Sequence, residues 1–216
     1  MADGSAPLLA LLRFALFAGV GIVAPGIGLQ RLARVRWDPA LVVPLGLLAC
    51  ALFYWLSLLS GVPLVFPVLV LAAGAGAWCR PWASRAAGPS LRGALFPIAV
   101  LVALFAITQY RVNRVDSSGA FLLDVGEHVD TALHVGLSFE LVAGYPPQVP
   151  GFSGVPMQYH VASHLVRAAA SRWALIHPYD ALCRFDITVW AVALVLALRA
   201  AAAAARRART RATAQT

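Results

Sequence analysis

The chain has 216 residues, of which 61% are hydrophobic and 12% are charged, and its mean hydropathy is +0.78. A soluble domain carries about 25% charged residues and roughly 45–50% apolar residues. This composition excludes a soluble globular enzyme, a disordered chain and a disulfide-stabilised scaffold. It predicts an all-α protein, a polytopic membrane helix bundle.

Positive charge is concentrated in short segments beside the apolar runs. The formal net charge is +8, and all 17 basic residues are arginines. Ten of them lie in the linkers 30–39 and 80–92 and in the tail 205–216. Arginine at the ends of apolar segments orients a membrane protein, with the arginine-bearing linkers in the cytoplasm. The pattern therefore predicts a multi-pass protein of the plasma (inner) membrane, with the lipid bilayer and no nucleic acid as its partner.

The apolar runs predict about five to six spans, each near the ~20 residues that a bilayer requires. In chain order we expect them at about 8–29, 40–60, 63–79, 93–109, 157–176 and 185–204. Pro25 interrupts the first, and the turn at 61–63 joins the second and third in a tight hairpin. These spans divide the chain into four parts: a four-span bundle over 1–109, an external loop over 110–156, two further membrane helices over 157–204, and an arginine-rich tail over 205–216. We expect 157–176 to cross the membrane, which would place the tail outside.

Titratable residues concentrate in the external loop. Residues 120–143 predict one amphipathic helix lying along the membrane surface. One stripe of this helix, at steps of 3, 4, 3 and 4, holds Asp124, Glu127, Thr131, His134 and Ser138. Asp130 borders that stripe, one turn before His134. The segment 144–156 has four prolines and three glycines in 13 residues, which excludes a helix there.

A second polar stripe is predicted on the helix 157–176, after Tyr159 at its start. It holds His160, Ser163, His164, Arg167 and Ser171. An arginine costs roughly 2.5–3.5 kcal/mol at the bilayer centre, so this helix can cross only if its stripe faces protein, water or an anionic ligand. A carboxylate with a histidine one turn away can accept a proton, and arginine with histidine can neutralise a phosphate.

The motifs of this region resemble those of the GT-C-type integral-membrane glycosyltransferases, the protein mannosyltransferase-like and aminoarabinose transferase-like enzymes. The resemblance is carried by D-T-A-L-H over 130–134, E-L-V-A-G-Y-P-P over 140–147, G-V-P-M-Q-Y-H over 154–160, and His164. It implies transfer of a sugar from a polyprenyl-phosphate carrier at the outer membrane face. Since such enzymes continue for several more spans, the resemblance covers their N-terminal portion only.

The resemblance also implies roles for individual residues. Asp130 matches the motif aspartate, a general base or metal-linked residue, and its rivals on the same helix are Asp124 and Glu127. The substrate-binding residues it implies are His134, Tyr159, His160, His164 and Arg167, with Arg167 on the lipid-linked phosphate.

Other interpretations of the same residues remain open. The acidic stripe is also typical of a solvated surface helix, and Arg167 of an arginine that snorkels or pairs with an acidic neighbour. The spacing of His160 and His164 also fits half of a zinc site. The cofactor is unknown, and a divalent cation is one candidate, its ligands drawn from Asp130, His134 and His160 or from His128.

Three functions therefore stay under consideration. The first is a membrane glycosyltransferase, or a truncated part of one. The second is a non-catalytic multi-pass protein or partner subunit that binds a lipid carrier and joins another membrane chain. The third is a metal-dependent membrane hydrolase that uses the His and Asp residues.

Overall fold

The computed structural model describes residues 5–34, 37–76, 92–115, 121–123 and 129–213. Most of these residues are helical, as the composition predicts. Three helices of the described part are long and apolar enough to cross a membrane, at Leu9–Leu32, Pro39–Ser60 and Thr188–Thr210. They indicate a membrane protein. Two further apolar helices, Val65–Ala75 and Gly93–Leu104, are shorter than a full span.

The first span is one continuous rod made of three segments. The α-helix α1 (Ser5–Phe17) passes into a π-helical stretch, η1 (Ala18–Val23), and then into α2 (Ala24–Leu32). Pro25 follows the wide turns directly. Since proline lacks a backbone N–H and crowds the preceding turn, a π-type widening lets the helix continue where the sequence predicted an interruption.

A tight hairpin joins the next two helices, as predicted. A short 3-10 turn, η2 (Pro39–Leu41), is capped by the Asp38 carboxylate, which accepts from the Ala40 N–H at 3.0 Å. Helix α3 (Val42–Ser60) then ends at Gly61, whose φ of +65° requires the left-handed region that glycine favours. The return helix α4 (Val65–Ala75) is only 11 residues long.

Glycines bring the backbones of these helices unusually close. A Cβ added at Gly26 of α2 would lie 1.9 Å from the Val42 carbonyl oxygen of α3, and one at Gly46 of α3 would lie 2.0 Å from that of Ile22. At Gly28 the corresponding distance to the Ala73 oxygen of α4 is 1.6 Å. Small residues at helix contacts are the usual means of close packing in membranes.

The remaining elements form a fourth apolar helix, a cap and a long final helix. Helix α5 (Arg92–Val112) leads into the antiparallel pair β1 (Asn113–Val115) and β2 (Phe121–Leu123). Helix α6 (Val129–Ala143), the pair β3 (Gln148–Val149) and β4 (Phe152–Pro156), and helix α7 (Ala162–Ala174) follow. Helix α8 (Pro178–Asp180) and the π-helical η3 (Ala181–Phe185) lead into α9 (Asp186–Thr213).

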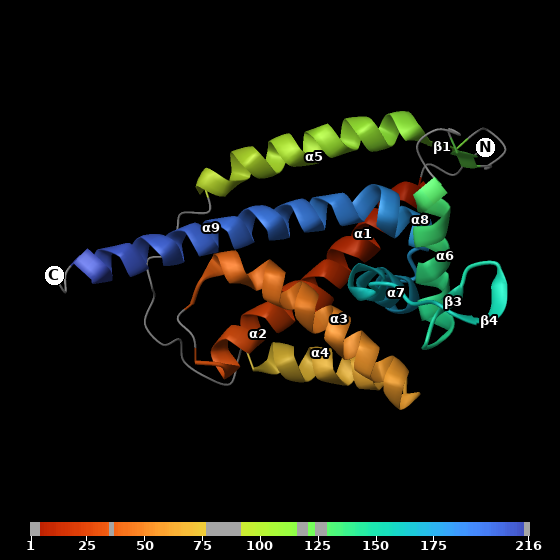
Figure 1. The fold of residues 1–216 in the computed structure, drawn as a ribbon, viewed down its shortest axis with the longest axis horizontal. Helices are drawn as coiled ribbons and strands as arrows, with labels where there is room; N and C mark the ends of the chain where they lie inside the picture. The colour runs from red at the N-terminus through yellow and green to blue at the C-terminus, as the bar shows by residue number, and fades with distance from the viewer. Residues whose placement is uncertain (1–4, 35–36, 77–91, 116–120, 124–128, 214–216) are drawn as a thin grey trace.

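Two predictions for the polar region are corrected by the structure. The expected single helix over 120–143 is replaced by strand β2 and the shorter helix α6, which begins at Val129. The expected span over 157–176 is a helix of 13 residues, about 20 Å long, and is thus shorter than the ~30 Å of hydrocarbon. Figure 1 shows α7 nearly end-on, whereas α5 and α9 run across the view.

The arginine-rich end of α9 and the end of α2 point toward the same end of the bundle (Figure 1). In Figure 1 the C-terminal ends of both helices lie at the left end of the bundle, while α6, α7 and the strands cap the right end. Arg31 and Arg34 close the first rod, and Arg206 and Arg209 lie near the end of α9. The tail thus lies at the same end as the first arginine linker, in agreement with the positive-inside tendency and not with the predicted crossing.

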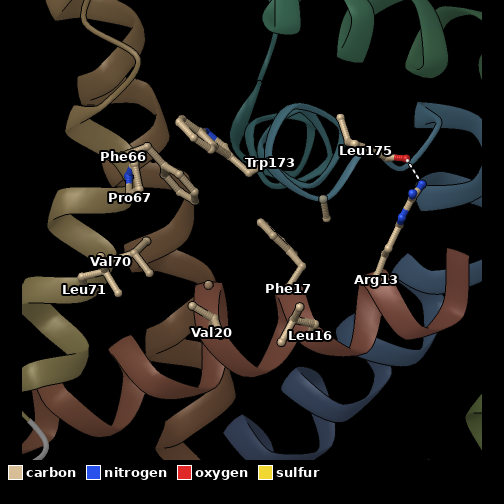
Figure 2. Close-up of a pocket in the computed structure, with 12 residues that line it drawn as sticks. Arg13, Leu16, Phe17, Val20, Phe66, Pro67, Val70, Leu71, Trp173 and Leu175 are labelled. Atoms are coloured by element: carbon tan, nitrogen blue, oxygen red, sulfur yellow. Dashed lines mark hydrogen bonds between the residues drawn. The ribbon is translucent and has the colours of Figure 1, made fainter. Parts of the chain in front are cut away.

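An apolar groove opens along the side of the bundle (Figure 2). It lies between α1, α4 and the C-terminal end of α7, and Arg13 stands at its edge.

Candidate functional site

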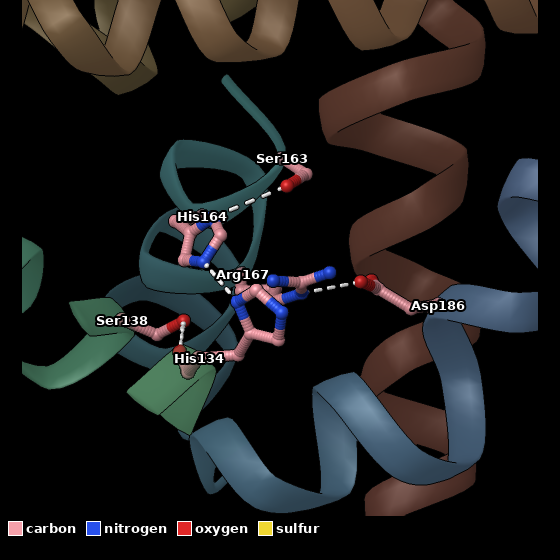
Figure 3. A network of polar contacts seen from close by, with 6 residues as sticks. All are labelled: His134, Ser138, Ser163, His164, Arg167 and Asp186. Carbon is pink, nitrogen blue, oxygen red and sulfur yellow. Dashed lines mark hydrogen bonds and ion pairs between the residues drawn. The ribbon is translucent and has the colours of Figure 1, made fainter. Parts of the chain in front are cut away.

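The candidate site lies at the capped end of the bundle, where α6 packs on α7 (Figure 3). Helix α7 is buried without a break from His164 to Ala170, because α1, α3 and α6 all pack against it. Over this stretch, from His164 to Ala170, the helix has no exposed residue. Its polar side chains must therefore find partners inside the protein.

Two histidines from different helices meet in this interior. The Nδ1 of His134, on α6, lies 3.0 Å from the Nε2 of His164, on α7. The other ring nitrogen of His164 is 3.2 Å from the Ser163 hydroxyl. One ring donates and the other accepts across the 3.0 Å contact, so both imidazoles cannot be protonated at these nitrogens together.

The surroundings keep both imidazoles neutral. Burial lowers the pKa of His164 to about 3, and the positive charge of Arg167 adds to the effect. Burial and Arg167 also lower the pKa of His134, while the carboxylate of Asp130 opposes that change. Neutral imidazoles near pH 7 can accept a proton or a hydrogen bond from a hydroxyl group.

We expect the buried His164 to make the fold sensitive to acid. The pKa of His164 is near 6.5 in the unfolded chain and about 3 in the folded chain, so between these pH values the unfolded chain binds more protons. The stability that the neutral, buried His164 contributes is therefore fully present above about pH 6.5, and it is lost as the pH falls toward 3. The His164→Gln variant should show a smaller fall in melting temperature between about pH 7 and about pH 5 than the unmodified protein, measured in detergent. His160→Gln, at an exposed position, is the control; equal falls in all three proteins would contradict the prediction.

Arg167 has a buried partner that the sequence analysis did not identify. Its Nε forms an ion pair with the carboxylate of Asp186, the first residue of α9, and the two side chains are 10% and 8% exposed. Figure 3 shows Arg167 reaching from α7 to Asp186. Arg167 Nη1 is buried without a hydrogen-bond partner in the described part of the structure. The interpretation that Arg167 pairs with an acidic neighbour is thus confirmed, and one donor nitrogen, with two N–H groups, has no partner in that part.

Asp186 could have been suspected from charge balance alone. It stands at the start of the last apolar run, and a buried arginine requires a counter-charge. The two partners are 19 positions apart on different helices, and no periodic signal links them.

The aromatic residues expected at the site lie at its outer rim. Tyr159 and His160 are exposed, and their rings stack with centroids 3.9 Å apart. The centroid of the Tyr159 ring is 6.3 Å from that of His134 and 6.1 Å from that of His164. The structure therefore brings the five predicted substrate-binding residues into one region, in which Tyr159 and His160 are exposed and His164 and Arg167 are buried.

Among the described residues, no predicted catalytic carboxylate is buried in this site. Asp130 lies in the first turn of α6, one turn before His134, and its side chain is exposed. Asp124 and Glu127 lie outside the described residues, as does His128. Within the described ranges, no group of three or more His, Cys, Asp and Glu side chains is arranged to hold a metal ion, so Asp130, His134 and His160 do not form one there.

The site has an exposed rim, formed by Asp130, Tyr159 and His160, and a polar interior in which His164 and Arg167 are buried. The rim supplies a carboxylate and two aromatic rings, and the interior supplies two neutral imidazoles and a guanidinium with one unused donor. Such a set can bind an anionic or hydroxylated group through charge and hydrogen bonds, and the nearby Asp130 can accept a proton. Comparison with protein-family models, with curated proteins and with solved structures finds no match.

Proposed function

We propose that this membrane protein is a glycosyltransferase, or a part of one, that takes a sugar from a polyprenyl-phosphate carrier at the outer membrane face. The observation that carries the proposal is the buried Nη1 of Arg167 beside the His134–His164 pair. A buried N–H donor without an acceptor destabilises the protein, and a phosphate oxygen that accepts its hydrogen bond would remove that penalty.

In this proposal each part of the site has a distinct role. Arg167 binds the carrier phosphate, and His164 holds the ring of His134 through their 3.0 Å contact. His134 orients the acceptor hydroxyl, and Tyr159 stacks on the sugar together with His160. Asp130 is the general base, and Asp124 and Glu127 are its alternatives. The proposal includes a multi-pass arrangement in the plasma membrane, with α4 and α5 completing five spans.

The direct test is sugar transfer from a polyprenyl-phosphate sugar in proteoliposomes. Removal of a general base lowers such rates by about 10²–10⁴-fold, so Asp130→Asn should lose transfer on that scale. Glu140→Gln removes a carboxylate near the other end of α6 and should keep transfer near the unmodified level. Unchanged transfer by Asp130→Asn, Asp124→Asn and Glu127→Gln would refute the catalytic role of this helix.

A second candidate is a non-catalytic subunit that binds a lipid carrier next to another membrane chain. It is favoured by the Arg167–Asp186 pair, because Asp186 already neutralises the charge that a phosphate would require. Under this alternative, purified protein binds the carrier but transfers no sugar until a second membrane chain is added. Co-purification of such a chain, with activity restored on mixing, distinguishes it from the enzyme.

A further inference from the structure

The lateral groove is separate from the histidine site and has a different character. Its volume is about 450 Å³, and its lining is apolar except for Arg13. Phe66 and Val70 of α4 form its buried floor, each 3% exposed, whereas Leu16 and Leu175 on its rim are 69% and 70% exposed. Leu16 belongs to the first span, and an exposed apolar side chain on a membrane-spanning helix faces hydrocarbon, so the groove is open to the lipid on this side.

Arg13 is placed near the polar end of this groove. It lies four residues into the span that begins at Leu9, about 6 Å along the helix axis. Leu16 and Val20 follow it at steps of three and four on the same face of the first rod, and they line the groove at greater depth. One helix face therefore presents a charge near the headgroup level, where arginine side chains extend, and apolar side chains below it.

Arg13 has no ion-pair partner in the part of the chain that the structure describes. Among the described residues, its guanidinium meets the Leu175 carbonyl oxygen at 3.5 Å and no carboxylate at ion-pair distance (Figure 2). A guanidinium has five N–H donors, and a single long contact leaves most of them available. An arginine at the edge of hydrocarbon is stabilised by an anionic partner.

We propose that this groove binds one acyl chain of an anionic phospholipid, with the lipid phosphate on Arg13. Along the groove, the positive charge of Arg13 is followed by apolar walls. A phospholipid has the matching order, with a negative headgroup followed by an apolar acyl chain. The volume lies within the roughly 300–1,000 Å³ of small-ligand pockets, so it suits a single chain better than an additional helix, which is about 10–12 Å across. This assignment does not depend on sugar transfer.

Native mass spectrometry of the purified protein tests the proposal with defined lipids. Phosphatidylglycerol and phosphatidylcholine with identical chains are added separately, and the fraction of protein that carries one lipid is measured. We expect about fivefold stronger retention of phosphatidylglycerol, the effect of one arginine near an anionic headgroup. Arg13→Gln should remove this preference, and Arg13→Lys should retain part of it.

Two further variants separate charge from shape. Arg206→Gln removes the same charge from an exposed position on α9 and should leave the preference unchanged. Val20→Trp should lower retention of both lipids by filling the groove from its 45%-exposed wall, and it tests the site even if Arg13→Gln fails to fold. Equal retention of the two lipids by the unmodified protein, or lipid retention by Val20→Trp at the unmodified level, would overturn the proposal. Displacement of phosphatidylglycerol by equimolar polyprenyl phosphate would also overturn it, by assigning the groove to the carrier.

Discussion

Replacing Gly28 by leucine is expected to disrupt the packing of the first rod on α4 and to lower the melting temperature strongly. A Cβ at this position would lie 1.6 Å from the Ala73 carbonyl oxygen, which is a backbone atom and cannot rotate away. The two helices must therefore separate. Overpacking typically costs up to ~3 kcal/mol and more where nothing can yield. For a chain of this size, 3 kcal/mol corresponds to a fall of roughly 10 °C.

Gly19 offers a matched control on the same rod. Nothing lies within 4 Å of a Cβ added there, and the residue is exposed. Gly19→Leu should therefore unfold within a few degrees of the unmodified protein when both are heated in the same detergent. A Gly28→Leu variant as stable as Gly19→Leu would show that α2 and α4 do not pack as closely as the structure has them.

The second large effect is expected at the buried ion pair. Replacing Arg167 by methionine leaves the Asp186 carboxylate buried without a counter-charge, and loss of one partner of such a pair costs about 3–5 kcal/mol. Asp186→Leu should destabilise the protein for the corresponding reason, because it leaves the Arg167 guanidinium buried without a counter-charge. The double variant Arg167→Met/Asp186→Leu has no buried charge at these positions, so it should recover much of the lost stability, because apolar replacement of a whole buried pair is often neutral.

The double variant also separates structure from function. Melting temperatures of the four proteins complete a double-mutant cycle, and additive losses would contradict a direct pair. If Arg167 serves only to hold α7 against α9, the stable double variant should keep whatever activity the protein has. If Arg167 binds the carrier phosphate, the double variant should be folded and inactive, with weaker binding of polyprenyl phosphate.

The apolar runs alone predicted most of the helices and much of the architecture. The all-α class, the hairpin at Gly61 and helices near 40–60, 93–109 and 185–204 follow from local properties, namely continuous hydrophobicity and turn chemistry. The expected five to six spans remain a prediction, since three helices have the full length and apolarity. The residue types at the site were also visible in the sequence, because histidine, tyrosine and arginine stand out in an apolar chain.

Only the tertiary structure decided which of these residues meet. The contact of His134 with His164 joins positions 30 residues apart, and that of Arg167 with Asp186 joins positions 19 apart on different helices. No periodicity links such positions, because periodicity describes one helix and not the way two helices approach. The direction of α7 was likewise decided by packing: α1, α3 and α6 enclose it, and its buried polar groups are stabilised by partners within the protein. The sequence therefore determined what the helices are made of, and the packing between them determined where the charge is buried.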